Sequence, residues 1–185
     1  MRRNLITLVL LAALAACTQY SLVEVKRQTI GGVYSVEPQI AWSKTTEGKV
    51  ELWTVDGPWL EALRFYKGLG DGDTLDKAPG RKKSPTYRAG MKASEVMEFV
   101  VDSLARSGAS NVQARNLRPT RFGTVPGFRF DLIFLSPEGL EIDGTVAGAV
   151  VAEKLHMIMY TGARAHYYPK YKDDVERIID SIQMI

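Results

Sequence analysis

The side chains that could carry chemistry in this sequence are few: one cysteine, two histidines and scattered carboxylates. Hydrolysis by a Ser-His-Asp triad needs a serine on a strained turn beside a histidine base, but the chain has no Gly-x-Ser-x-Gly motif. A zinc site needs three or four converging ligands, and His156 and His166 fall in no spacing typical of one. We therefore expect no catalytic residue, no metal and no cofactor.

The two histidines have different surroundings. His156 falls inside the apolar stretch 155–161, which indicates a structural histidine within a strand. His166 lies in the segment 164–171, where cations and aromatic rings occur together and could line a binding surface. Packing at the start of a helix explains the same residues more simply. The candidate binding surface consists of Arg164, His166, Tyr167 and Tyr168.

Acidic and aromatic residues elsewhere offer two further candidate sites. Asp71, Asp73 and Asp76 lack the glycine and the final carboxylate that an EF-hand loop requires, so we expect no calcium site. Three tryptophans could form a platform for a sugar or a partner, but burial in the core is the simpler interpretation. These tryptophans are Trp42, Trp53 and Trp59.

The single cysteine, Cys17, follows a pattern typical of an export signal over residues 1–16. Arg2 and Arg3 precede an apolar run over residues 5–14, which is much shorter than the roughly 20 residues of a membrane-crossing helix. The alternative is an ordinary secretory signal with Cys17 near its cleavage point. That alternative leaves an unpaired thiol in an oxidising compartment, because the chain has no second cysteine.

Residues 14–17, Leu-Ala-Ala-Cys, resemble the lipobox of bacterial lipoproteins. The resemblance implies that Cys17 becomes the amino terminus and carries a diacylglyceryl group and a further acyl chain such as palmitate. Two or more acyl chains hold a protein firmly on a membrane. By the sorting rule of such lipoproteins, Thr18 implies the outer membrane of a bacterial cell envelope, with the protein facing the periplasm.

Composition excludes some classes of partner. Without Arg2 and Arg3 the formal charge falls from +3 to about +1, which is too close to neutral for a nucleic-acid-binding protein. The balance of 45% hydrophobic and 24% charged residues is that of an ordinary globular domain. We expect a lipidated N-terminus and tether over residues 17–29, although 22–25 could pair in a sheet, and a single domain over residues 30–185.

The elements that must position these residues are strands and two helices. Apolar positions recur at helical spacing over residues 94–107, after Ser94 as the expected N-cap, and again over about 169–183. Between these helices, alternating patterns predict antiparallel strands; Phe128, Phe130, Leu132 and Phe134 share one face. Residues 59–66 are ambiguous and favour a strand. Gly, Pro and charged residues predict a long loop at about 68–92.

This arrangement is α+β, with a mainly antiparallel sheet packed by two main helices. With its closing sequence Ile-Ile-Asp-Ser-Ile at 178–182, it resembles the Mog1/PsbP-like α/β/α sandwich. The resemblance implies a non-enzymatic binding or assembly role and carries over no catalytic residue. We expect a lipid-anchored module that contacts another envelope protein through the long loop and the segment 164–171. The alternative is a small-molecule carrier or minor enzyme with a pocket between sheet and helix, using His166, Arg164 or Asp131.

Overall fold

The computed structural model describes residues 20–75 and 84–185. The expected export signal, Cys17, Thr18 and Asp76 lie outside the described residues. Strands pair from Ser21 onward, within the segment expected as a tether, so Leu22 and Val23 take the sheet pairing that the sequence left open.

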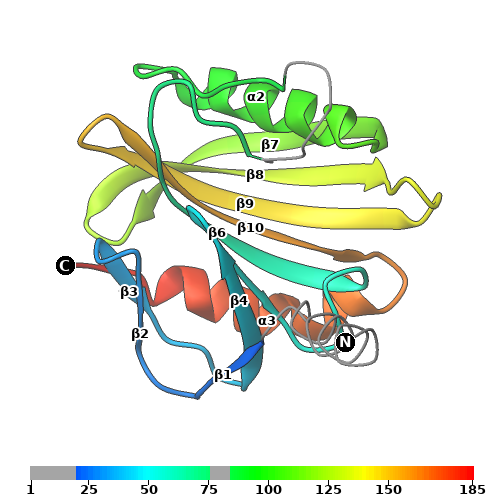
Figure 1. Ribbon diagram of the computed structural model, residues 1–185, viewed down its shortest axis with the longest axis horizontal. Coiled ribbons are helices and arrows are strands. Elements are labelled where there is room, and N and C mark those ends of the chain that lie inside the picture. Colours follow the sequence, from blue (N-terminus) through cyan, green and yellow to red (C-terminus); the bar gives the residue numbers. More distant parts are fainter. Residues whose placement is uncertain (1–19, 76–83) are drawn as a thin grey trace, which may run out of the picture.

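Eight strands form one antiparallel sheet in the order β1-β4-β5-β6-β10-β9-β8-β7 (Figure 1). A second, three-stranded sheet has the order β11-β3-β2. The strands are β1 Ser21–Val23, β2 Gln28–Ile30, β3 Tyr34–Val36, β4 Trp42–Glu47, β5 Val50–Thr54, β6 Glu61–Leu69, β7 Ser110–Phe122, β8 Val125–Leu135, β9 Glu141–Val151, β10 Lys154–Ala163 and β11 Gln183–Met184.

Two helices cover opposite faces of the large sheet. Helix α2 (Ala93–Arg106) lies above it in Figure 1 and helix α3 (Tyr167–Asp180) lies below. Strand β10 shows how the chain divides the two sides: His156, Ile158 and Tyr160 face α3, while Met157 and Met159 face α2. Both faces of β10 are therefore buried, and the structure is the α/β/α sandwich expected from the sequence.

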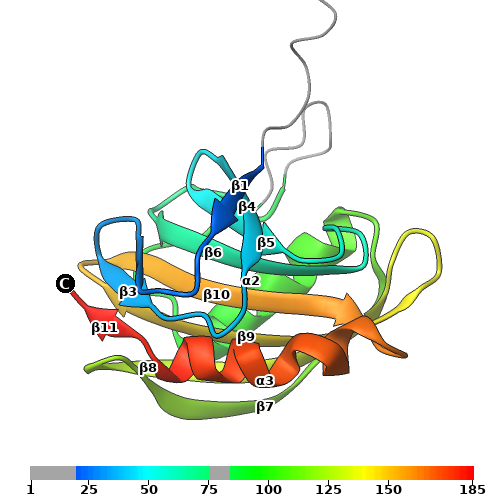
Figure 2. The same ribbon diagram turned by 90° about the horizontal axis from the view of Figure 1, so that it is seen from below.

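The α3 side of the sheet is closed by the apolar stripe of the helix. Figure 2 shows α3 lying along β10 and β9, with β11 following it. Tyr171, Val175, Ile178, Ile179 and Ile182 are all buried, as the sequence predicted. Small side chains at Ala147 and Ala149 of β9 belong to the same core, where they give the helix room to approach the sheet.

The α2 side is covered by a helix and a loop together. The four alternating residues of β8, from Phe128 to Phe134, are buried on this side, as predicted. The described parts of the predicted loop contribute Leu75 and Tyr87 to the same core. Gly148 leaves space for the Phe128 ring, because a Cβ there would lie 2.8 Å from Phe128 Cζ.

Three element boundaries differ from the expectations. Residues 61–66 form a strand as predicted, but β6 continues to Leu69, so the loop begins later than residue 68. Helix α2 has Lys92 rather than Ser94 as its N-cap, because the Glu95 carboxylate accepts a hydrogen bond from Lys92 N (2.9 Å). Helix α3 begins at Tyr167 and ends at Asp180, so His166 is its N-cap.

Candidate functional site

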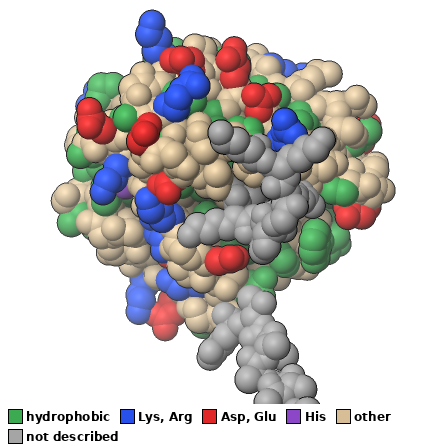
Figure 3. Space-filling model, turned by 45° about the horizontal axis from the view of Figure 1, so that its top comes forward, with side chains coloured by type: hydrophobic (Ala, Val, Ile, Leu, Met, Phe, Trp, Pro, Cys, Tyr) green, Lys and Arg blue, Asp and Glu red, His purple; other side chains and the backbone are tan. Residues whose placement is uncertain are grey.

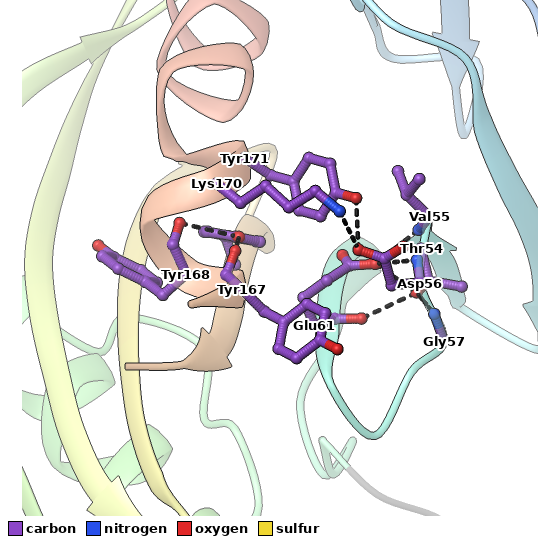
Figure 4. Close-up of polar contacts among 10 residues, drawn as sticks. Thr54, Val55, Asp56, Gly57, Glu61, Tyr167, Tyr168, Lys170 and Tyr171 are labelled. Atoms are coloured by element: carbon purple, nitrogen blue, oxygen red, sulfur yellow. Dashed lines mark hydrogen bonds and ion pairs between the residues drawn. The ribbon is translucent and has the colours of Figure 1, made fainter. Parts of the chain in front are cut away.

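A tight turn between β5 and β6 lies at the start of helix α3 (Figure 4). The buried Glu61 carboxylate fixes this turn: its Oε1 accepts hydrogen bonds from Thr54 Oγ1 (2.6 Å), Val55 N (2.6 Å) and Asp56 N (3.0 Å). Its Oε2 is buried without a hydrogen-bond partner. Burial raises the pKa of Glu61, because a charged carboxylate loses hydration there.

A second carboxylate ties this turn to the helix. Asp56 Oδ2 accepts hydrogen bonds from Lys170 Nζ (2.7 Å) and Tyr171 Oη (2.5 Å), and Figure 4 shows Asp56 facing the first turns of α3. These bonds, that from Lys170 above all, lower the pKa of Asp56. Leu60 O also accepts from Ala163 N (2.9 Å), so the turn is fastened to β10 as well.

Trp59 stands on this fastened turn with 85% of its surface exposed. The expectation that all three tryptophans lie in the core is therefore wrong for Trp59 and right for Trp42 and Trp53, which are buried. Trp59 lies in a turn over residues 57–60, which the Leu60 N to Gly57 O hydrogen bond (3.0 Å) closes ahead of β6. An exposed tryptophan on a rigid turn is a common anchor for binding.

The candidate residues 164–168 come together at the same end of the sheet, but they do different things. Arg164 donates hydrogen bonds to Asp143 (2.8 Å) and Glu141 (3.0 Å) and so joins β10 to β9. Tyr168 stacks on Tyr160, with ring centroids 5.2 Å apart. These contacts make Arg164 and Tyr168 structural parts of the chain reversal.

His166 is the most accessible member of the candidate set, and Tyr167 is half-buried beside it. His166 is exposed, and its ring lies 5.0 Å from that of Tyr167, edge to face. Lys170 Nζ lies 6.0 Å from the centroid of the Tyr167 ring. We name the group formed by the turn and the helix start the turn-helix surface; it consists of Asp56, Trp59, His166, Tyr167 and Lys170.

A pocket of about 380 Å³ lies on the other side of the sheet, between the C-terminal half of α2 and the ends of β6, β8, β9 and β10. Apolar side chains form much of its wall, among them Leu104, Phe134, Ile142 and Met159. Arg64 also lines it and donates a hydrogen bond to Thr161 Oγ1 (3.1 Å). Trp59 lies at its rim, so the pocket opens beside the turn-helix surface.

The polar residues that the sequence proposed for such a pocket do not line it. The described lining includes none of Arg164, His166 and Asp131. Asp131 lies on the α3 side of β8, where it accepts a hydrogen bond from Asn116 (2.8 Å). Arg64 was missed because nothing in the pattern of β6 distinguishes a pocket arginine from one that faces water.

The described residues hold neither a metal-binding cluster nor a membrane-crossing helix. Over 20–75 and 84–185, no three His, Cys, Asp or Glu side chains lie close enough to share a metal ion. No helix in those ranges is long and apolar enough to cross a bilayer. His156 is buried in β10, as expected, and burial lowers its pKa.

Comparison with known proteins places the fold. No protein-family model matches the sequence, and a search of curated proteins gives no match either. Among solved structures, the chain is similar to cyanobacterial PsbP (CyanoP) from Synechocystis sp. PCC 6803, with a TM-score of 0.58 and 12% sequence identity. The match covers 92% of this chain and 95% of that one. The chain therefore has a PsbP-like α+β fold, as the sequence predicted.

Proposed function

We propose that this protein is a lipid-anchored, non-enzymatic binding module of the bacterial cell envelope. The sequence Leu-Ala-Ala-Cys at 14–17 supports acylation of Cys17, and Thr18 supports the outer membrane, with the domain facing the periplasm. The PsbP-like fold is compatible with binding or assembly and implies no chemistry by itself. The proposed partner is another envelope protein, which docks on the turn-helix surface.

The exposed Trp59 carries this proposal. Its indole has 85% of its surface in water, while Glu61 and Asp56 hold the backbone beneath it in one conformation. A partner that covers this ring gains a large apolar contact without having to order the turn first. Burial in a complex would remove this apolar surface from water.

A protein partner fits the surrounding charges better than a membrane surface does. Asp56 and Lys170 are paired beside Trp59, and Arg164 is paired with Glu141 and Asp143 near by. Figure 3, which brings the α2 side forward, shows cationic and anionic side chains interspersed on that face as well. An anionic bilayer would attract a surface rich in unpaired Lys and Arg, whereas a mixed surface suits a complementary protein.

Crosslinking in intact cells tests the docking site. A photoreactive phenylalanine analogue at Trp59 or at His166 should give one and the same crosslinked protein. The same analogue at Leu117, which is 37% exposed on β7, should not give that product. Trp59→Ala should then reduce the His166 crosslink at least roughly tenfold, the loss expected for an anchor residue. An equal product from Leu117, crosslinks to lipid alone, or an unchanged yield in Trp59→Ala would contradict the proposal.

The anchor has its own test. Mass spectrometry of the native protein should find acyl chains on Cys17, and Cys17→Ser should leave the membrane fraction, because those chains supply the attachment. A Thr18→Asp variant should change the membrane but not the acylation. An unmodified thiol at Cys17, or a Cys17→Ser protein that stays membrane-bound, would count against the anchor without affecting the docking surface.

A further inference from the structure

We propose that the pocket beneath helix α2 binds a small amphiphile with an apolar body and a single carboxylate, held by Arg64. This proposal goes beyond the proposed function, and of the five residues of the turn-helix surface only Trp59 lines the pocket. The pocket's volume of about 380 Å³ falls within the range of small-molecule sites, which is roughly 300 to 1,000 Å³. The charge and shape of its lining decide what it would take.

Arg64 sits in this pocket without a counter-ion. Its side chain is half-buried on β6, and its hydrogen-bond partner is the neutral hydroxyl of Thr161 (3.1 Å). No ion pair joins Arg64 to a carboxylate among the described residues, although the other two partly buried arginines there each have one: Arg129 with Glu176 and Arg164 with Asp143. A partly dehydrated guanidinium with free N–H groups favours an anion in a fixed fork geometry.

The number of charges in the lining selects a carboxylate. Arg64 is the one cationic side chain among the described lining residues, which also include two carboxylates. Glu138 is hydrogen-bonded to Ser136, and Glu61 Oε1 is held by the β5–β6 turn. A doubly charged phosphate group would meet one cation and two carboxylates there. A carboxylate carries a single charge, and its two oxygens match the two parallel N–H groups of an arginine.

The rest of the pocket suits an apolar body. Leu104 of α2 faces Met159 of β10, and Phe134 and Ile142 belong to the same wall. The opening lies beside Trp59, whose exposed indole would cover the distal part of a bound chain. An apolar tail buried in this wall leaves water, and its carboxylate replaces the missing counter-ion of Arg64.

Titration with matched ten-carbon probes tests the site. The full-length Cys17→Ser chain, which has no acyl chain to compete, would be titrated with decanoate, decanol and decyl phosphate by calorimetry. Decanoate should bind with a stoichiometry of one and roughly ten- to hundredfold more tightly than decanol, as expected for a charge-assisted hydrogen bond. Equal binding of decanoate and decanol, or no binding of decanoate, would overturn the proposal, and tighter binding of decyl phosphate would overturn the carboxylate.

Variants at Arg64 identify the residue that holds the head group. Arg64→Met should lower the affinity for decanoate by a similar factor and leave that for decanol unchanged, while Arg64→Lys should keep part of it. Leu104→Trp should block all probes, and Arg115→Met, an exposed arginine on β7, should change nothing. Thermal unfolding would verify that each variant is folded. Unchanged decanoate binding in Arg64→Met would refute the assignment.

His166→Ala separates this proposal from the docking surface. It should reduce recovery of the protein partner and leave decanoate binding as it is, because His166 is not among the residues that line the pocket. Arg64→Met should do the reverse. Failure of one proposal would therefore be visible without failure of the other.

Discussion

The two faces of the central sheet are covered differently. On the α3 side the apolar stripe of helix α3 packs on the large sheet together with the small sheet, whose Tyr34 and Val36 belong to the same core as Trp42 and Tyr160. On the α2 side the cover is divided between a helix and the loop after β6, which contributes Leu75 and Tyr87. A pocket lies at the end of the sheet where this divided cover ends.

The difference follows from the residues that each cover offers. Gly162 lets the backbone of α3 approach β10, because a Cβ there would lie 3.0 Å from Tyr168 N. On the other side, α2 ends at Arg106, and its last turns present the short side chains of Ser103 and Ser107 to the pocket. Short side chains leave the space above β6 and β10 unfilled. The α2 face therefore retains space for a ligand at one end of the sheet.

The largest expected effect breaks the closed side. Ile178 is fully buried in α3, so Ile178→Ala should lower the free energy of unfolding by about 2 to 5 kcal/mol. Leu104→Ala on the pocket side should cost less than half as much, because Leu104 is only half-buried and its neighbours already border open space. Urea unfolding of both variants measures the difference. Equal losses would show that the two sides are packed alike.

A smaller effect tests the polar contact that seats α3. Asp174 is buried and accepts hydrogen bonds from Gln39 N (2.8 Å) and Trp42 Nε1 (3.0 Å). Asp174→Ala leaves both donors without an acceptor and should destabilise the protein by about 2 to 3 kcal/mol. Asp173→Ala, an exposed neighbour on the same helix, is the control and should change stability little. Thermal unfolding would measure both variants. An Asp174→Ala protein as stable as the wild type would contradict a stabilising role for this contact.

The two carboxylates of the β5–β6 turn should respond to pH in opposite directions. Burial raises the pKa of Glu61 above its ordinary 4.5, so the folded state binds that proton more tightly than the unfolded state. The stability from Glu61 is present below pH 4.5 and is lost as pH rises through its folded pKa. Compared with the wild type, Glu61→Gln should therefore gain stability as pH rises from about 4.5.

Asp56→Asn provides the matched comparison. In the wild type, the hydrogen bond from Lys170 lowers the pKa of Asp56 below 3.8. The stability that Asp56 contributes is therefore present above pH 3.8 and is lost as pH falls through the folded pKa. The cost of Asp56→Asn should accordingly shrink in acid. Denaturant unfolding at pH values between about 3 and 8 would measure the free energy of unfolding of both variants. Parallel pH curves for the two variants would contradict the different environments of these carboxylates.

The periodic parts of this fold were predictable from the sequence. Strand alternation placed the Phe128–Phe134 set on one face, and the helical stripe from Tyr171 to Ile179 marked the buried face of α3. Both patterns arise because burial of apolar surface dictates which positions must be apolar. The fold class, and the resemblance to PsbP, followed from the order of these elements.

The candidate site was only partly predictable, because it depends on contacts between distant residues. The cluster of aromatic and cationic residues around His166 was visible in the sequence, but its neighbour Trp59 lies more than a hundred residues earlier and was expected in the core. Arg64 lines a pocket because the end of α2 lies above it, and its hydrogen-bond partner is Thr161. No local sequence pattern reveals either contact. The prediction that Ser94 is the N-cap of α2 was wrong, because the helix begins earlier: Lys92 is the N-cap and its backbone N–H donates to the Glu95 carboxylate.

The smallest expected effects come from substitutions that enlarge a side chain on each side of the sheet. Ala147 is buried beneath α3, so Ala147→Val has no free space to occupy and should destabilise the protein by about 1 to 3 kcal/mol. Leu104→Phe places its added volume in the pocket and should stabilise the protein by about 0.5 to 1 kcal/mol, since filling a cavity restores lost contacts. Thermal unfolding with and without decanoate would separate the two sides further: decanoate should raise the melting temperature of the Ala147→Val protein but not that of Leu104→Phe. A Leu104→Phe protein that loses stability and still responds to decanoate would mean that the space beneath α2 lies elsewhere than beside Leu104.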